Sequence, residues 1–431
     1  MGRPHARIAT ALAVLGVVTG IAACGGSSDE STAGPRALDL KIGNLVPKTG
    51  FLSAFGEPAQ QAADLAVDEI RAAAAKARAR HRVTISHADY QSLPKPAVEL
   101  SAKLVEQGAS CLLGPWGGGE TGRVISRIGT PMKVLQMTPA ASGGALSRAD
   151  DDGYLQRLVP PDRLQADALA ELIDEELRGG ARGKKVSVVA SESTYGKQLV
   201  AGFKDAWTGK GGTIAQTVLL ERKQPSYQEE IEKLDSVDPD AWVFFEFSDV
   251  FSRLANDLVA RSETNFNPKR AFGTDSLAHS RLVTSAPQAS DGLRGVAIGA
   301  PRRGGAAREF NKRFKATGDA KRQTFDAQQF DAVVLCYLSA VAAGSTKGED
   351  MADHVRRVSA PPGRKFTWLE LDLAVKALEA GQDIDYEGAS GQINMNDDGD
   401  PTAGVYDVYE FRGGRLRITD QIGVPPGREG I

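Results

Sequence analysis

Few residues capable of catalysis stand at the spacings that chemistry requires. The five histidines, at positions 5, 81, 87, 279 and 354, are scattered, and the chain lacks an H-E-x-x-H zinc motif, a G-x-S-x-G nucleophile elbow and a P-loop. Residues 394–399 begin like a calcium loop, but Val405 stands where a bidentate Glu is needed, which favours a hairpin turn. We therefore predict that the protein is not an enzyme and holds no metal ion or cofactor.

A glycine-rich segment at 117–122 matches the pattern G-x-G-x-x-G between a predicted strand and a predicted helix. A dinucleotide site needs an acidic residue about twenty positions later, where Met137 and Thr138 stand instead. The pattern therefore argues against a nucleotide. It predicts either a plain tight turn or a loop whose backbone N–H groups bind a ligand carboxylate or amide oxygen.

The N-terminus has the features of an export signal. Arg3 and Arg7 precede an uncharged apolar run at 8–21, which is too short for a comfortable membrane span. The run ends in Ile-Ala-Ala-Cys24, which resembles a bacterial lipoprotein processing box. We predict a signal peptide at 1–23, a lipid on Cys24 and a flexible tether at 24–36. Ordinary signal cleavage beside a chance cysteine is the alternative.

The composition is that of an ordinary globular protein. The 431 residues are 41% hydrophobic and 25% charged, which argues against disorder and against several membrane spans. The formal net charge is -3, so no basic excess is present to neutralise phosphates. We therefore expect no nucleic-acid partner.

Two cysteines remain in the predicted body. Cys111 and Cys336 both lie in apolar runs and show no metal-ligand spacing. We predict two buried, unpaired thiols, with a disulfide between them as the alternative for an exported protein.

Strand and helix patterns alternate along the chain, and this predicts an α/β fold of parallel sheets covered by helices on both faces. Predicted strands are 38–43, 82–85, 110–113, 134–137, 185–190, 213–220, 241–245 and 270–273, with a hairpin at 405–411 and 416–421. Predicted helices are 57–80, 96–107, 121–128, 165–178, 195–207, 227–234, 250–261, 306–317, 327–343 and 368–380. Two runs of such units, 38–155 and 185–275, suggest two similar lobes.

A series of short motifs resembles the Leu/Ile/Val-binding family, the type I solute receptors of ABC importers. Their order and spacing carry the resemblance over nearly all of residues 38–420. The matching segments are 42–50, 55–56, 62–70, 111–115, 138–142, Arg157 with Asp162 and Gln165, 195–196, 292–295, 330–333, 385–391 and 399–401.

The resemblance implies two doubly wound parallel-sheet lobes joined by three crossings, with a small ligand bound between them. From the matched crossings we expect lobe 1 at 37–157 and 300–400, and lobe 2 at 158–299 and 401–431.

The resemblance also implies roles for particular residues. Ala140 and Ser142 would bind a ligand carboxylate, Tyr195 would contact the ligand from lobe 2, and Glu246 or Asp275 would pair with a ligand ammonium. A turn, core packing and solvated loop carboxylates are the respective alternatives. The full predicted ligand-binding set is Phe55, Trp116, Gly117, Gly118, Ala140, Ser142, Tyr195, Glu246 and Asp275.

One departure from the family pattern bears on the ligand. A serine usually follows Gly-Pro in the first pocket loop, whereas this chain has Trp116 and three glycines. A hydroxyl donor is lost and a large indole is gained. The ligand is therefore left open among leucine-like amino acids, other amino acids, aromatic acids, amides and ureas.

These observations together predict an exported, lipid-anchored solute-binding protein on the outer face of the cytoplasmic membrane. Its partners would be a small ligand and an ABC permease, and we expect a monomer. A binding protein that signals to a partner is the first alternative, because the same fold serves both roles. An exported enzyme is the second alternative.

Overall fold

The computed structural model describes residues 36–261, 264–402 and 404–424. The predicted signal peptide, Cys24 and the tether up to residue 35 lie outside the described residues, as do residues 425–431. Within the described chain, the strands form three sheets. Buried parallel strands joined by helices dominate, so the predicted α/β fold class is confirmed.

The first sheet is entirely parallel and has the order β2-β1-β3-β4-β5. Its strands are β1 Leu38–Val46, β2 His81–Asp89, β3 Cys111–Leu113, β4 Leu135–Thr138 and β5 Leu155–Arg157. The helices between them are α1 Ser53–Ala77, α2 Pro94–Glu106, α3 Gly118–Val124 and the short α4 Thr130–Met132. The carboxyl ends of these strands carry the loops that matter below.

The second sheet has the order β15-β14-β10-β9-β8-β6-β7. Its parallel strands are β6 Lys185–Ser191, β7 Thr213–Leu220, β8 Ala241–Phe245, β9 Ala271–Gly273 and β10 Arg294–Ile298, with α5 Asp162–Glu176, α6 Thr194–Gly209, α7 Gln228–Asp235, α8 Ser248–Ala260, α9 Leu282–Ser285 and α10 Pro287–Ser290 around them. The predicted C-terminal hairpin is present as β14 Gly404–Phe411 and β15 Leu416–Val424, and β14 pairs antiparallel with β10.

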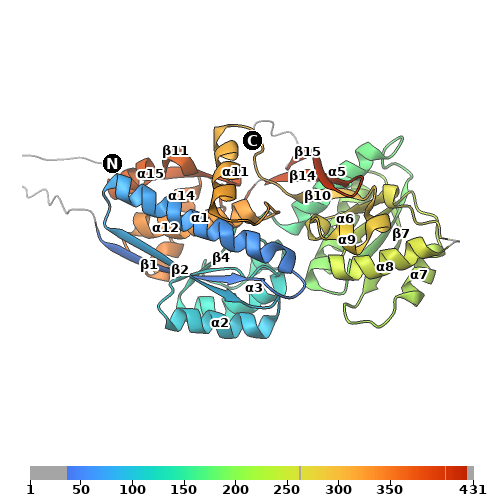
Figure 1. Ribbon diagram of the computed structural model, residues 1–431, viewed down its shortest axis with the longest axis horizontal. Helices are drawn as coiled ribbons and strands as arrows, with labels where there is room; N and C mark the ends of the chain where they lie inside the picture. The colour runs from blue at the N-terminus through green and yellow to red at the C-terminus, as the bar shows by residue number, and fades with distance from the viewer. Residues whose placement is uncertain (1–35, 262–263, 403, 425–431) are drawn as a thin grey trace, which may run out of the picture. The chain divides into compact units, whose positions relative to one another are not determined.

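The late helices pack beside the first sheet rather than the second. They are α11 Gly305–Thr317, α12 Asp326–Ala343, α13 Gly348–Ala352, α14 Val355–Ser359 and α15 Leu371–Glu379, and Figure 1 shows α12, α14 and α15 gathered with α1. A small third sheet, of β11 Arg364–Thr367, β12 Ile384–Gly388 and β13 Gly391–Gln392, joins them. We call the first and third sheets with their helices lobe 1, and the second sheet with α5–α10 lobe 2.

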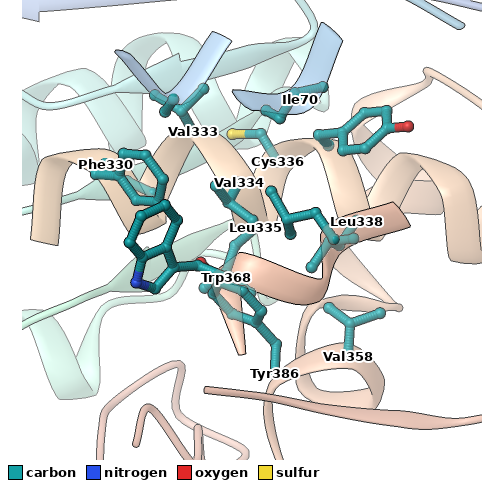
Figure 2. Packing of buried hydrophobic residues seen from close by; sticks show 14 of the residues in the cluster. Ile70, Phe330, Val333, Val334, Leu335, Cys336, Leu338, Val358, Trp368 and Tyr386 are labelled. Atoms are coloured by element: carbon teal, nitrogen blue, oxygen red, sulfur yellow. The ribbon is translucent and has the colours of Figure 1, made fainter. Parts of the chain in front are cut away.

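The core of lobe 1 is built around α12, which is buried on all sides (Figure 2). Phe330, Leu335 and Leu338 of this helix pack with Trp368 and Tyr386 from the third sheet and its neighbouring turn. A helix that is apolar all round is expected inside a large domain. In the described chain no single helix has the length and apolar composition to cross a membrane. Helix α12 and the helical segment 348–359 meet those two criteria together, but the chain bends by 103° between them.

The prediction of two unpaired thiols is wrong, because Cys111 and Cys336 form a disulfide. Cys111 lies in β3 and Cys336 faces it from α12, with the two Cα atoms 6.3 Å apart. That separation lies within the range that a disulfide spans. The bond therefore ties the central strand of lobe 1 to the helix that packs on it.

Two helix boundaries differ from the sequence-based expectation for local reasons. The helix expected at 57–80 begins earlier, at Ser53, and contains Pro58 in its second turn; it ends before Arg78, whose left-handed backbone (φ 63°) stops it. The helix expected at 121–128 begins at Gly118 and passes into a single π turn, Ile125–Gly129. The start of α3 therefore lies within the glycine-rich segment.

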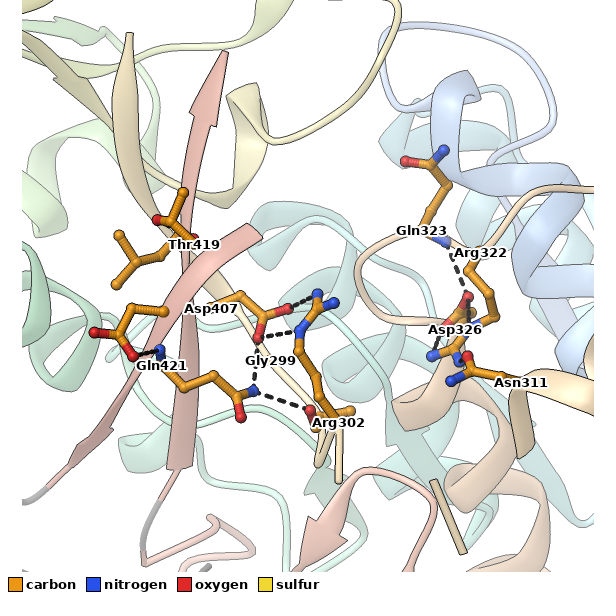
Figure 3. A network of polar contacts seen from close by, with 12 residues as sticks. Gly299, Arg302, Asn311, Arg322, Gln323, Asp326, Asp407, Thr419 and Gln421 are labelled. Carbon is orange, nitrogen blue, oxygen red and sulfur yellow. Dashed lines mark hydrogen bonds and ion pairs between the residues drawn. The ribbon is translucent and has the colours of Figure 1, made fainter. Parts of the chain in front are cut away.

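The chain passes between the two lobes after β5, after β10 and before β14. Figure 3 shows the polar contacts around the second passage, where Arg302 pairs with Asp407 of β14 and Gln421 of β15 donates to the same carboxylate. Nearby, Arg322 pairs with Asp326 at the start of α12. The Arg302–Asp407 pair therefore fastens the passage to β14 of lobe 2, whereas the Arg322–Asp326 pair lies within lobe 1.

Candidate ligand-binding cleft

Loops that follow parallel strands of both lobes meet around one cavity of about 420 Å³. From lobe 1 come the loops after β1, β3 and β4, and from lobe 2 come those after β6, β7, β8 and β9. The size is suited to one small molecule, and ligand sites in open α/β sheets lie at such strand ends. This cavity is therefore the candidate ligand-binding cleft.

Eight of the nine predicted ligand-binding residues line the cavity. They are Phe55, Trp116, Gly117, Gly118, Ala140, Ser142, Tyr195 and Asp275. The ninth, Glu246, is not among the lining residues. It lies buried one residue beyond β8, where its Oε1 atom accepts a hydrogen bond from the backbone of Phe247 at 2.8 Å.

The lobe 1 side of the cavity offers backbone donors. Thr138 Oγ1 donates to the Pro115 carbonyl at 2.8 Å and accepts from Ala141 N–H at 3.1 Å, which fixes the two pocket loops to each other. The N–H groups of Ala140 and Ser142 make no hydrogen bond to another described residue. Two free donors on one turn are suited to an anionic or carbonyl oxygen.

The lobe 2 side carries a buried carboxylate. Asp275 is 4% exposed, and its Oδ1 atom accepts from Tyr195 Oη and from Gln165 Nε2, both at 2.9 Å. Burial raises the pKa of Asp275, while the bonds from Gln165 and Tyr195 oppose that rise. Both side-chain hydrogen bonds end on Oδ1, and the backbone N–H groups of Asp275 and Ser276 also bond to the carboxylate.

Aromatic rings form much of the remaining wall. The rings of Phe55 and Trp116 are stacked with centroids 6.2 Å apart, and Phe325 meets both edge-on at 5.7 and 5.6 Å. Across the cavity, Phe51 meets Phe247 of lobe 2 at 4.9 Å. Such walls favour an apolar or planar ligand body.

The charges on the wall are mainly negative. Glu120, Glu192 and Asp275 contribute carboxylates, of which Glu192 is paired with Lys197, and among the described lining residues Arg222 is the one cationic side chain. Arg222 Nη1 donates to both oxygens of Asp249, at 2.8 and 2.7 Å, and its guanidinium lies 3.9 Å above the Phe51 ring. Since Asp249 already neutralises Arg222, little positive charge is left for an anionic ligand.

Several lining residues were missed by sequence reasoning. Arg222 and Phe247 follow strands of lobe 2 as Asp275 does, so their positions after predicted strands could have pointed to them. Glu120 lies inside the glycine-rich segment, but no role was predicted for it. Phe325 follows no strand and carries no sequence signal. The other missed lining residues are Phe51, Leu52, Gly119, Ala141, Gly143, Glu192, Ser193, Thr194 and Ser276.

We expect Glu246 to make stability depend on pH. Burial raises its pKa from an ordinary 4.5 to about 8. Because the folded state binds this proton more tightly than the unfolded chain, its favourable contribution is lost as pH rises from about 4.5 to about 8. The melting temperature of Glu246→Gln should therefore rise relative to that of the wild type between pH 5 and pH 8. Above pH 8 the difference between the two should stay constant.

Thermal denaturation of the ligand-free proteins at pH 5, 6.5, 8 and 9 measures this difference. Glu99→Gln, a change at an exposed site on α2, is the control and should show no such trend. A melting temperature of Glu246→Gln that keeps a constant offset from wild type, or that falls relative to wild type toward pH 8, would contradict the expected behaviour.

Comparison with known proteins places this cleft in a family. The family model described as periplasmic binding protein matches residues 39–415. The chain belongs to this family. The resemblance to its Leu/Ile/Val-binding members is confirmed, since a Leu/Ile/Val-binding protein homolog of Brucella melitensis is 24% identical over 387 residues, covering 88% of this chain and 93% of that protein.

Two other family members widen the comparison. The chemotactic signal transduction system substrate-binding protein BasB of Halobacterium salinarum is 22% identical and covers 85% of each chain. The solved structure of LivJ from Streptococcus pneumoniae, a branched-chain amino acid transporter substrate-binding protein in complex with isoleucine, superposes with a TM-score of 0.72 at 20% identity. That match covers 89% of this chain and 99% of LivJ, and it shows a shared fold.

Proposed function

We propose that this protein is the extracytoplasmic solute-binding component of an ABC importer, which captures an amino acid or a related small carboxylate or amide and delivers it to the permease. The observation that carries the proposal is the cavity lined from both lobes, with free backbone donors on one side and Asp275 on the other. A zwitterion needs such a pair of opposite anchors. The family relationship supports the same role.

We infer that the ligand carboxylate binds the N–H groups of Ala140 and Ser142, and that the ammonium binds Asp275 with Tyr195 positioned beside it. An ammonium taken from water needs a charged partner, because an unpaired buried cation is costly. The negative wall charge and the neutralised Arg222 support a ligand that carries a cation over a purely anionic aromatic acid.

We propose that binding closes the two lobes on the ligand, with lobe 1 at 37–157 and 300–400 and lobe 2 at 158–299 and 401–431. A ligand that contacts both lobes stabilises the closed arrangement by its higher affinity for that state. The closed form would then be the one that docks on the permease.

Signalling is the second candidate function. It is favoured by BasB, a relative that carries a chemotactic signal transduction role in its name. The two functions use the same ligand cleft and differ in the partner that reads the closed form. Loss of solute uptake in a deletion strain supports transport, whereas intact uptake with a lost response to the solute supports signalling.

The proposal is tested by thermal denaturation of the purified protein against amino acids, aromatic acids, amides and ureas. A ligand present at 100 times its Kd adds roughly 2.7 kcal/mol of stability. We expect one or more amino acids to raise the melting temperature. Stabilisation by aromatic acids alone would refute the pairing of a ligand ammonium with Asp275, and stabilisation by none of these compounds, or turnover of the stabilising compound, would overturn the proposed function.

We propose in addition that the mature protein is anchored by a lipid on Cys24, because the apolar run before it resembles a lipoprotein signal. Replacing Cys24 by Ser should move the protein from the membrane fraction to the soluble fraction. Fractionation followed by immunoblotting measures the shift, and Ser27→Ala should remain in the membrane fraction. A Cys24→Ser protein that stays membrane-bound after signal removal would refute the anchor.

A further inference from the structure

We propose that Glu120 makes one end of the cleft a subsite for a second positive charge, so that the site selects amino acids with a cationic side chain. This inference rests on the proposed amino-acid function and names the substrate class. It arises from a carboxylate that the function described above does not use.

Glu120 lines the cavity and is 8% exposed. Its carboxylate accepts a hydrogen bond from its own backbone N–H, and among the described residues no side chain hydrogen-bonds to it. Arg123 and Arg222 act on it only through their field, and Arg222 is already paired with Asp249. A carboxylate that is nine-tenths buried without a charged partner is unfavourable, and such groups gather at binding sites where a ligand supplies that partner.

The space beside this carboxylate is open. A Cβ atom added at Gly117 would overlap Glu120 Oε2, which places the carboxylate against the glycine-rich loop. A Cβ atom added at Gly118 or Gly119 would meet nothing within 4 Å, although both residues line the cavity. The glycines therefore leave room for a ligand group next to Glu120.

The walls around that space also favour a cation. Trp116, whose ring stacks with Phe55 and meets Phe325, directly precedes the glycines. Aromatic faces attract ammonium and guanidinium groups through their quadrupoles. A ligand carboxylate placed here would instead be repelled by Glu120, so the carboxylate belongs with Ala140 and Ser142 and the side-chain cation belongs here.

A local structural role does not account for the burial. Glu120 stands in the first turn of α3, where a negative charge is favourable beside the helix dipole. An exposed carboxylate would supply that benefit without the cost of desolvation. Burial raises the pKa of Glu120. This direction is expected for a buried carboxylate that lacks a cationic partner.

The test is calorimetric titration of the purified protein with two pairs of matched ligands, lysine with norleucine and arginine with citrulline. Members of a pair have similar size, and one member lacks the side-chain charge. We expect the wild type to bind the charged member of at least one pair at least about 10-fold more tightly. Glu120→Gln should remove that preference while still binding the neutral member.

Glu99→Gln is the control, because it removes the same charge at an exposed site on the neighbouring helix α2. This variant should keep the preference for the charged ligand. If wild type binds both members of each pair equally, or if Glu120→Gln keeps the preference, the subsite is refuted while the amino-acid function stands. If no amino acid binds wild type, both proposals fall. The wild-type comparison needs no variant, so it decides the question even if Glu120→Gln fails to fold.

Discussion

Replacing Asp275 by Asn should weaken amino-acid binding by about 3–5 kcal/mol, or roughly 150-fold to 4000-fold in Kd. Asn keeps the size of the side chain and an oxygen for Tyr195, but it removes the charge that faces the ligand ammonium. Because Asp275 is almost fully buried, water cannot compensate for the missing charge. Calorimetric titration of wild type and variant with the amino acid that stabilises the protein most measures the loss.

Two further variants show whether the effect belongs to Asp275. Ser142→Ala should cost less, about 1–3 kcal/mol for a lost hydrogen bond to a charged group, because the backbone donors remain. Glu246→Gln should cost least, since Glu246 is not among the residues that line the cavity. If neither Asp275→Asn nor Glu246→Gln weakens binding, the ligand carries no ammonium at this end. An aromatic acid or amide between Trp116 and Phe55 would then be favoured.

Replacing Asp400 by Ala should destabilise the folded protein by about 3–5 kcal/mol, because it leaves the buried charge of Arg157 without its partner. Arg157 is 1% exposed and ends β5, and its guanidinium also donates to the Gly143 carbonyl and to Ser147. The backbone of Arg157 additionally bonds to Gly399 at 2.9 Å. This pair therefore joins the first passage between the lobes to the third.

Urea denaturation followed by circular dichroism gives the free energy of unfolding. Asp397→Ala is the matched control, because Asp397 lies three residues away, is 84% exposed and pairs with Arg356 at the surface. An exposed pair of this kind contributes at most about 1 kcal/mol. If the two variants lose equal free energy of unfolding, the buried Arg157–Asp400 pair contributes no more to stability than an exposed pair.

The regular part of the fold was predictable because its periodicity is strong. The continuous apolar run Ala241–Phe245 is typical of a strand buried on both faces, and such runs alternate with amphipathic helices. The third sheet was not foreseen, since β13 has only two residues and β11 begins with two exposed charged residues. The disulfide was only the alternative prediction, because no local pattern tells which face of α12 meets β3.

The candidate site was predictable where function follows from strand ends. The family resemblance pointed to Asp275 and Tyr195, and both stand just beyond strands, β9 and β6, whose ends form the ligand edge of the sheet. Glu246 occupies an equivalent place, but the Phe247 N–H binds its side chain away from the cavity wall. Phe325 was not predictable, because tertiary contacts hold this bulky residue in a left-handed backbone (φ 76°) that it rarely adopts.

The most direct test of the central claim compares one amino acid with its deaminated analogue. Wild-type protein is titrated by calorimetry with the best-binding amino acid, and then with the carboxylic acid of the same skeleton that lacks the amino group. If the ligand ammonium binds Asp275 in the cleft, the amino acid should bind at least about 100-fold more tightly. Equal or tighter binding of the deaminated acid would contradict the account.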